Sequence, residues 1–267
     1  MQPKTISEQL MFNTVKLVAS DGSSGTGFFF DFDIDGKTYP TLITNKHVVR
    51  YNPNEAMTFF LHLETGNNSS EENHQVTYQT NWIFHSKQDL CFCFINPVLE
   101  EVKKRTGKNV FYKANTKSIV ATQEKLEELS ALEELVMVGY PIGLWDHQNN
   151  FPIFRKGYTA SHPALDFNQQ GIGLVDMACF PGSSGSPIYI LNEGTYSDKT
   201  GNIYMGKRII LIGILYAGPQ YNAQGNLVIT TIPTQQKVFA STPIMTNLGY
   251  YVKASELNEF EAYIKNL

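Results

Sequence analysis

The sequence predicts an all-β protein arranged as a barrel or a sandwich. Short apolar runs are separated by turn residues over most of the chain, and they do not alternate with helical patterns as βα units do. The length of 267 residues suits one large all-β unit or two smaller ones. Hydrophobic residues make up 42% and charged residues 17%, against about 25% charged in an average soluble chain, which disfavours disorder and coiled coil.

The N-terminal part is expected to form short strands joined by tight turns. The first strand is expected at 12–19. Phe28-Phe29-Phe30 and Thr41-Leu42-Ile43-Thr44 are expected to pair as a hairpin through Asp35-Gly36, which supplies the positive φ angles of a tight turn. Further strands are expected at 56–63, 76–82 and 90–95.

A change of pattern near residue 97 predicts a connector. Val98, Leu99 and Val102 have helical spacing, and Thr106-Gly107 ends that segment. Strand patterns then resume, at 116–121, 135–139, 152–160, 172–179, 186–191, 208–217 and 227–232.

The chain is expected to close with a helix. Leu257, Phe260 and Ile264 form one apolar stripe, and Ser255 is a good N-cap before it. The patterns together predict three segments, namely an N-terminal β unit (1–97), a connector with short helices (98–134) and a C-terminal β unit that includes the helix (135–267).

Charge and cysteine content restrict the partners and the compartment. Twenty-one Lys and Arg against 25 Asp and Glu give a net charge of −4, so nucleic acid and anionic membranes have no general electrostatic reason to bind. The three cysteines form no disulfide framework. The start of the chain lacks a signal-peptide pattern, and the densest apolar stretches, 135–145 and 208–218, are too short to span a membrane. We therefore expect a cytoplasmic protein with no nucleic-acid or membrane partner.

The most specific local signal is the turn Phe180-Pro181-Gly182-Ser183-Ser184-Gly185-Ser186-Pro187, which contains the pattern G-x-S-G-x-P. A catalytic serine needs small neighbours. It also needs backbone N–H groups that converge on the oxyanion formed during acyl transfer. Ser184 is therefore the candidate nucleophile.

A serine hydroxyl is a weak nucleophile at neutral pH, so it needs a base, and the base needs a carboxylate that fixes its tautomer. His47 follows an apolar strand in Thr44-Asn45-Lys46-His47-Val48-Val49. Asp89 precedes another apolar strand in Gln88-Asp89-Leu90. These two residues are the candidate base and its orienting acid.

The other histidines and the cysteines are expected to be structural. Cys91 and Cys93 lie in an apolar strand, where cysteine acts as a small hydrophobe, and Cys179 is expected to be buried or beside the pocket. Neither a thiol nucleophile nor a metal is therefore expected. The spacing of the other five histidines does not match a metal-ligand set. They are His62, His74, His85, His147 and His162.

Several motifs in order resemble those of the bacterial-type trypsin-like serine peptidases of the chymotrypsin fold. They are Gly25-Thr26-Gly27-Phe28, Thr44-Asn45-Lys46-His47-Val48-Val49, Asp89-Leu90, Gly139-Tyr140-Pro141-Ile142-Gly143 and Gly182-Ser183-Ser184-Gly185-Ser186-Pro187. The resemblance implies an all-β fold of two six-stranded antiparallel β-barrels with the triad between them. It also implies a catalytic triad of His47, Asp89 and Ser184, an oxyanion hole formed by the N–H groups of Gly182 and Ser184, and no metal or organic cofactor.

The resemblance also predicts the substrate-binding residues. Ala178 stands at the base of the main specificity pocket, where no carboxylate is present to pair with Lys or Arg. We therefore expect cleavage after small or medium apolar residues. Tyr216, Ala217 and Gly218 belong to the strand that pairs with the substrate backbone. The far wall of the pocket falls somewhere in 225–232 and is not aligned.

The sequence predicts a serine endopeptidase acting on protein or peptide substrates. Ser183 replaces the Asp that pairs with a new amino terminus in the digestive members, so activation by pro-peptide cleavage loses its electrostatic basis. Two alternatives stay open. One is a regulatory protease that an activating protein partner switches on, and the other is a catalytically silent peptide-binding module on the same fold.

Overall fold

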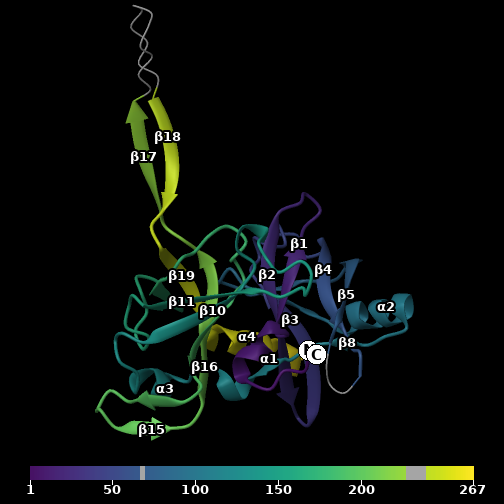
Figure 1. The fold of residues 1–267 in the computed structure, drawn as a ribbon, viewed down its shortest axis with the longest axis horizontal. Coiled ribbons are helices and arrows are strands. Elements are labelled where there is room, and N and C mark those ends of the chain that lie inside the picture. The colour runs from purple at the N-terminus through teal and green to yellow at the C-terminus, as the bar shows by residue number, and fades with distance from the viewer. Residues whose placement is uncertain (67–69, 227–238) are drawn as a thin grey trace, which may run out of the picture.

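The computed structural model describes residues 1–66, 70–226 and 239–267. It is built mostly of strands and closes with a short helix, so the all-β class and the C-terminal helix are confirmed (Figure 1). The strand expected at 227–232, and with it most of the unaligned pocket wall, lies outside the described residues.

The N-terminal part folds into a nine-stranded sheet. Its main path runs β5-β4-β1-β2-β3-β7-β6, and two short strands from the predicted connector extend it, with β8 on β4 and β9 on β2. The hairpin between β2 and β3 turns at Asp35 and Gly36, which both have positive φ. The strand bounds are β1 Thr14–Val18, β2 Ser24–Ile34, β3 Lys37–Thr44, β4 Ala56–Leu63, β5 Glu72–Gln79, β6 Ile83–Phe84, β7 Cys91–Phe94, β8 Val110–Phe111 and β9 Asn115–Thr116.

The C-terminal part forms a closed six-stranded barrel, in the order β10-β11-β12-β19-β16-β13. Two small two-stranded sheets lie outside it, and one of them, β17–β18, extends away from the body of the molecule (Figure 1). The bounds are β10 Glu134–Gly139, β11 Ile153–Thr159, β12 Ile172–Asp176, β13 Pro187–Asn192, β14 Thr195–Ser197, β15 Ile203–Met205, β16 Arg208–Ala217, β17 Gln220–Asn226, β18 Phe239–Met245 and β19 Leu248–Lys253.

Short helices lie at the N-terminus, in the connector, after β10 and at the C-terminus. The helix predicted after residue 97 is α2, which ends at Gly107 in the left-handed conformation. The expected N-cap at Ser255 is wrong, because Ala254–Glu256 forms a 3₁₀ turn that runs directly into α4. The bounds are α1 Ile6–Met11, α2 Asn96–Thr106, η1 Lys117–Ile119, α3 Gln123–Glu127, η2 Pro141–Gly143, η3 Ala254–Glu256 and α4 Leu257–Lys265. In the described part of the chain, no helix has the length and apolarity needed to cross a membrane.

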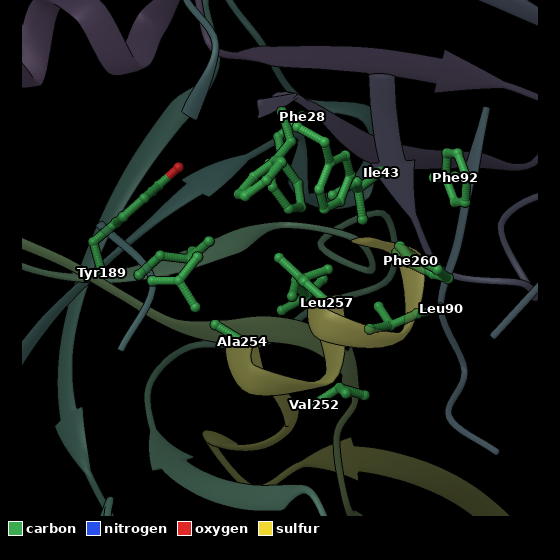
Figure 2. Packing of buried hydrophobic residues seen from close by; sticks show 14 of the residues in the cluster. Phe28, Ile43, Leu90, Phe92, Tyr189, Val252, Ala254, Leu257 and Phe260 are labelled. Carbon is green, nitrogen blue, oxygen red and sulfur yellow. The ribbon is translucent and has the colours of Figure 1, made fainter. Parts of the chain in front are cut away.

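One hydrophobic cluster joins the two halves. Phe28, Ile43 and Phe92 from the first sheet lie in the same cluster as Tyr189 and Val252 from the barrel. Figure 2 shows α4 packed into this cluster, with Leu257 and Phe260 turned toward it. This shared cluster and the short strands β8 and β9 connect the three predicted segments. The segment boundaries at 97 and 134 stay a prediction.

Replacing Phe260 with Ala should lower the free energy of unfolding by about 3–5 kcal/mol, because it removes a fully buried ring from the shared cluster. The ring lies 4.8 Å from that of Phe92. Urea unfolding followed by circular dichroism measures the change. The matched control is Tyr263→Ala on the same helix, which removes a ring that is 43% exposed and should lose less. Equal losses in the two variants would contradict this account of α4.

Candidate active site

His47 lies in a tight turn directly after β3. The backbone N–H of Arg50 donates to His47 O at 3.0 Å, and that of Tyr51 donates to Lys46 O at 2.8 Å. Arg50 and Tyr51 both have positive φ, which marks the abrupt change of direction. The imidazole is thereby held at the end of an inner strand of the sheet, and its side chain remains 33% exposed.

Asp89 meets His47 from the segment before β7. Its Oδ2 lies 2.5 Å from His47 Nδ1, and its Oδ1 accepts the backbone N–H of His47 at 3.2 Å. Asn45 Nδ2 donates to Asp89 O at 2.7 Å and fixes the segment that carries the carboxylate. When Nδ1 of a neutral imidazole donates to a carboxylate, Nε2 is left as a proton acceptor. The pair thus has the geometry of a base with its orienting acid.

Ser184 lies in a tight loop that is fixed to the N-terminal sheet by Thr26. Thr26 N donates to Ser184 O at 2.8 Å, and Thr26 Oγ1 donates to Gly182 O at 3.1 Å. Thr44, the last residue of β3, donates its hydroxyl to Thr26 O at 2.7 Å. Thr26 therefore anchors both the serine loop and the end of the strand that leads to His47.

The backbone N–H groups of the loop fall into two sets. Those of Ser183, Gly185 and Ser186 donate to Phe180 O, Leu215 O and Ser183 O, respectively. Those of Gly182 and Ser184 have no hydrogen-bond acceptor among the described residues. Gly182 has φ +85°, and a Cβ there would lie 2.6 Å from Tyr140 O, so a larger residue would disturb this loop. Two donors two positions apart are thus left available to an external oxygen.

The structure joins His47 to Asp89 directly, whereas Ser184 is connected to the end of β3 through Thr26 and Thr44. Within the described ranges, Ser184 Oγ makes no hydrogen bond to the His47 ring. Ser184 is partly exposed, whereas Ser183 is buried, and the Ser183 hydroxyl has no hydrogen-bond partner among the described residues. The hydrogen bond between a nucleophile and its base is often long in a ligand-free site and shortens when substrate binds.

The predicted pocket residues lie on two neighbouring segments. Ala178 and Cys179 follow β12, while Tyr216 and Ala217 end β16 and lead into Gly218. A Cβ at Gly218 would lie 3.7 Å from Cys179 Cβ, so the two segments run side by side. Ala178, Tyr216, Ala217 and Gly218 are all partly exposed, and their contact with a substrate stays a prediction.

Two further residues at this site were missed by the sequence prediction. Thr26 was identified only as part of a strand motif, although its backbone and hydroxyl organise the loop. Arg155, in β11, reaches the pocket segment, where its Nη1 donates to Ala178 O and its guanidinium lies 4.8 Å from the centre of the Phe180 ring. The sequence did place Arg155 in the strand expected at 152–160. Because alternate residues of a strand share a face, it also indicated which residues of that strand lie on the same side as Arg155.

The thiols are unsuited to act as nucleophiles. Burial raises the pKa of Cys93 to about 12 and that of Cys179 to about 11, and it raises the pKa of Cys91 well above the usual value. Protonated thiols are weak nucleophiles. Burial also lowers the pKa of His62 to about 4. Over the described ranges, no three His, Cys, Asp or Glu side chains are grouped so that they could hold a metal ion.

Comparison with known proteins gives resemblance at the level of structure only. No protein-family model matches the chain, and no curated protein matches it. Solved structures similar to it include the Rv3671c protease in an inactive form, at 13% identity and a TM-score of 0.47, over 99% of this chain and 98% of that one. Another is the thermostable serine protease AL20 from an extremophilic microorganism, at 10% identity and a TM-score of 0.49, over 97% and 98%.

A third similar structure is a serine protease of a human pathogenic astrovirus, at 12% identity and a TM-score of 0.40, over 91% of this chain and 89% of that one. All three of these solved structures are proteases, and the second and third are named as serine proteases. The resemblance of this chain to the bacterial-type trypsin-like serine peptidases stays a prediction from its sequence motifs. Because identity is low throughout, the chemistry of this chain has to be inferred from its own residues.

Proposed function

We propose that this protein is a serine endopeptidase that cleaves peptide bonds through an acyl-enzyme, with Ser184 as nucleophile, His47 as general base and Asp89 as its orienting acid. The observation that carries the proposal is the 2.5 Å contact between His47 Nδ1 and Asp89 Oδ2, two residues 42 positions apart in the chain. The N–H groups of Gly182 and Ser184 support it, because they have no acceptor among the described residues and acyl transfer needs such a pair of donors.

The mechanism follows from these groups. His47 Nε2 accepts the proton of Ser184 Oγ as the oxygen attacks the substrate carbonyl carbon. The resulting oxyanion accepts hydrogen bonds from the Gly182 and Ser184 N–H groups, and Asp89 stabilises the imidazolium. His47 then gives its proton to the departing amine, which leaves an acyl group on Ser184. Water, deprotonated by His47, attacks the ester carbonyl, and the proton returns to Ser184 Oγ.

The substrate is a protein or peptide whose backbone pairs with the end of β16 at Tyr216, Ala217 and Gly218. An added β-strand binds through main-chain hydrogen bonds, which suits an endopeptidase with many sequence targets. For the residue on the acyl side of the scissile bond, Ala178 offers no carboxylate to Lys or Arg. The prediction that this residue is small or medium and apolar was made from Ala178 alone. The preferred acyl-side residue also depends on Arg155, which contacts Ala178 O.

A partner-activated protease is the second candidate. The observation that favours it is that Ser184 Oγ and the His47 ring make no hydrogen bond among the described residues. An activating protein that closes this gap would complete the triad. The Ser183 hydroxyl, buried beside the nucleophile without a partner in the described part of the chain, replaces the carboxylate on which activation by a new amino terminus depends.

Labelling with a serine-directed fluorophosphonate tests the proposal. Rapid labelling of the purified protein, lost in Ser184→Ala, is expected for the endopeptidase. Ser183→Ala is the matched control and should still be labelled, because it removes a neighbouring hydroxyl that makes no hydrogen bond to a described residue. Labelling that appears only with an added activator would favour the second candidate. Absence of labelling under every condition would leave the peptide-binding module.

A further inference from the structure

Arg155 lies in β11 of the barrel, and its side chain reaches Ala178, the residue predicted to form the base of the specificity pocket. Its Cα pairs with that of Met137, and on the same face of β11 a Cβ at Gly157 would lie 2.8 Å from Met177 Cβ. This face of β11 therefore packs against the chain that leads to Ala178. Arg155 donates one N–H to Ala178 O and lies over the Phe180 ring.

Arg155 differs from every other arginine of the chain. Arg50 pairs with Asp21 and Glu55, Arg105 with Glu101, and Arg208 with Glu133. The Arg155 guanidinium has no carboxylate within 4.0 Å in the described part of the chain. It is also partly buried, and this burial lowers the pKa of Arg155 from its usual value. A partly buried charge raises the free energy of the protein when no opposite charge pairs with it.

The remaining donors of Arg155 suit a carboxylate. A guanidinium has five N–H donors in a planar fork, and the Ala178 carbonyl and the Phe180 ring satisfy only part of it. A carboxylate can accept two parallel hydrogen bonds from such a fork. The charge also repels Lys and Arg, in agreement with the lack of a carboxylate at Ala178.

We infer that Arg155 makes this pocket select substrates with Glu or Asp on the acyl side of the scissile bond. The inference rests on the proposed peptidase function and replaces an apolar preference with an acidic one. Apolar side chains would leave the guanidinium partly buried and unpaired, whereas a carboxylate would neutralise it in the bound complex.

The test compares kcat/KM for peptides that differ only at the acyl-side residue, which is Glu, Gln, Asp, Leu, Ala or Lys. Glu should exceed its neutral isostere Gln by about 10- to 100-fold, because a hydrogen-bonded charge pair is lost in Gln. Arg155→Gln should remove this difference by lowering the rate for Glu and leaving that for Gln nearly unchanged. Equal rates for Glu and Gln in the wild type would overturn the inference, as would faster cleavage after Leu or Ala.

Lys156→Gln is the matched control because it removes one positive charge from the next residue of the same strand. Lys156 is largely exposed and pairs with Glu134 at 2.8 Å. The control should keep the preference for Glu over Gln. If both variants lose this preference, the net charge of the protein explains it and the inference is overturned.

Fluorophosphonate labelling separates failure of this inference from failure of the function. The reagent reacts with Ser184 without an acyl-side residue, so labelling of the wild type and of Lys156→Gln reports the triad independently of the pocket. Labelled proteins that show no preference for Glu contradict the role of Arg155 alone. A wild-type protein that is never labelled contradicts both proposals.

Discussion

Replacing Asp89 with Asn should lower kcat for peptide cleavage by roughly 10,000-fold while leaving the fold intact. The Asn side chain can donate a hydrogen bond to His47 Nδ1. That contact would place the imidazole proton on Nε2, so the ring could no longer accept the proton of Ser184. The carboxylate also accepts the His47 backbone N–H at 3.2 Å, which the amide oxygen of Asn can still do. The loss should therefore be chemical rather than structural.

Single-turnover measurements with a peptide substrate give this change, and circular dichroism checks the fold. Asp33→Asn is the matched control, since it makes the same chemical change at an exposed aspartate that accepts a hydrogen bond from Thr38. The control should keep full activity. A fall of less than tenfold in Asp89→Asn would remove Asp89 from the proposed mechanism, even if Ser184 were still labelled.

Replacing Gly185 with Ala should lower the free energy of unfolding by about 2–5 kcal/mol and abolish cleavage. Gly185 has φ +84°, and its Cβ would lie 1.9 Å from Thr26 O and 2.6 Å from Thr44 Oγ1. Both neighbours belong to the contact that fixes the serine loop to the N-terminal sheet. Relief of the clash must separate Thr26 from the loop and displace Ser184.

Gly22→Ala separates the backbone strain from the clash. Gly22 has the same φ of +84°, but a Cβ there would have no described atom within 4 Å. The control should lose only about 1–2 kcal/mol, the cost of the left-handed conformation for a residue with a side chain. Urea unfolding measures both variants. Equal losses in the two would show that close packing against Thr26 contributes nothing.

Local chemistry made much of the fold predictable from the sequence. The turn at Asp35-Gly36 depends on residues that accept positive φ, and the strand expected at 56–63 coincides with β4. The strand ends that carry His47 and Asp89 were also located correctly, because apolar runs and the turns beside them are read within a few residues. The catalytic roles of these residues stay predictions, although the structure brings two of them into contact.

The starts of two helices and the long-range contacts of the candidate site were not predicted. Helix α1 was not predicted, although its N-terminus carries the capping box formed by Thr5 and Glu8. Ser255 has the side chain of an N-cap, yet the preceding 3₁₀ turn moves the start of α4 beyond it. Arg155 and Thr26 matter through partners far away in the chain, and no local pattern gives the identity of those partners.

The position of Thr26 makes the proposed peptidase chemistry depend on the contact between the N-terminal sheet and the C-terminal barrel. One residue of the first sheet supports the loop of the second by bonding to Ser184 O and Gly182 O. A change that separates the two halves would therefore be expected to stop the proposed reaction without altering a reacting group. A molecule that binds where Thr26 meets the serine loop would therefore be expected to inhibit the proposed reaction without contacting His47 or Asp89.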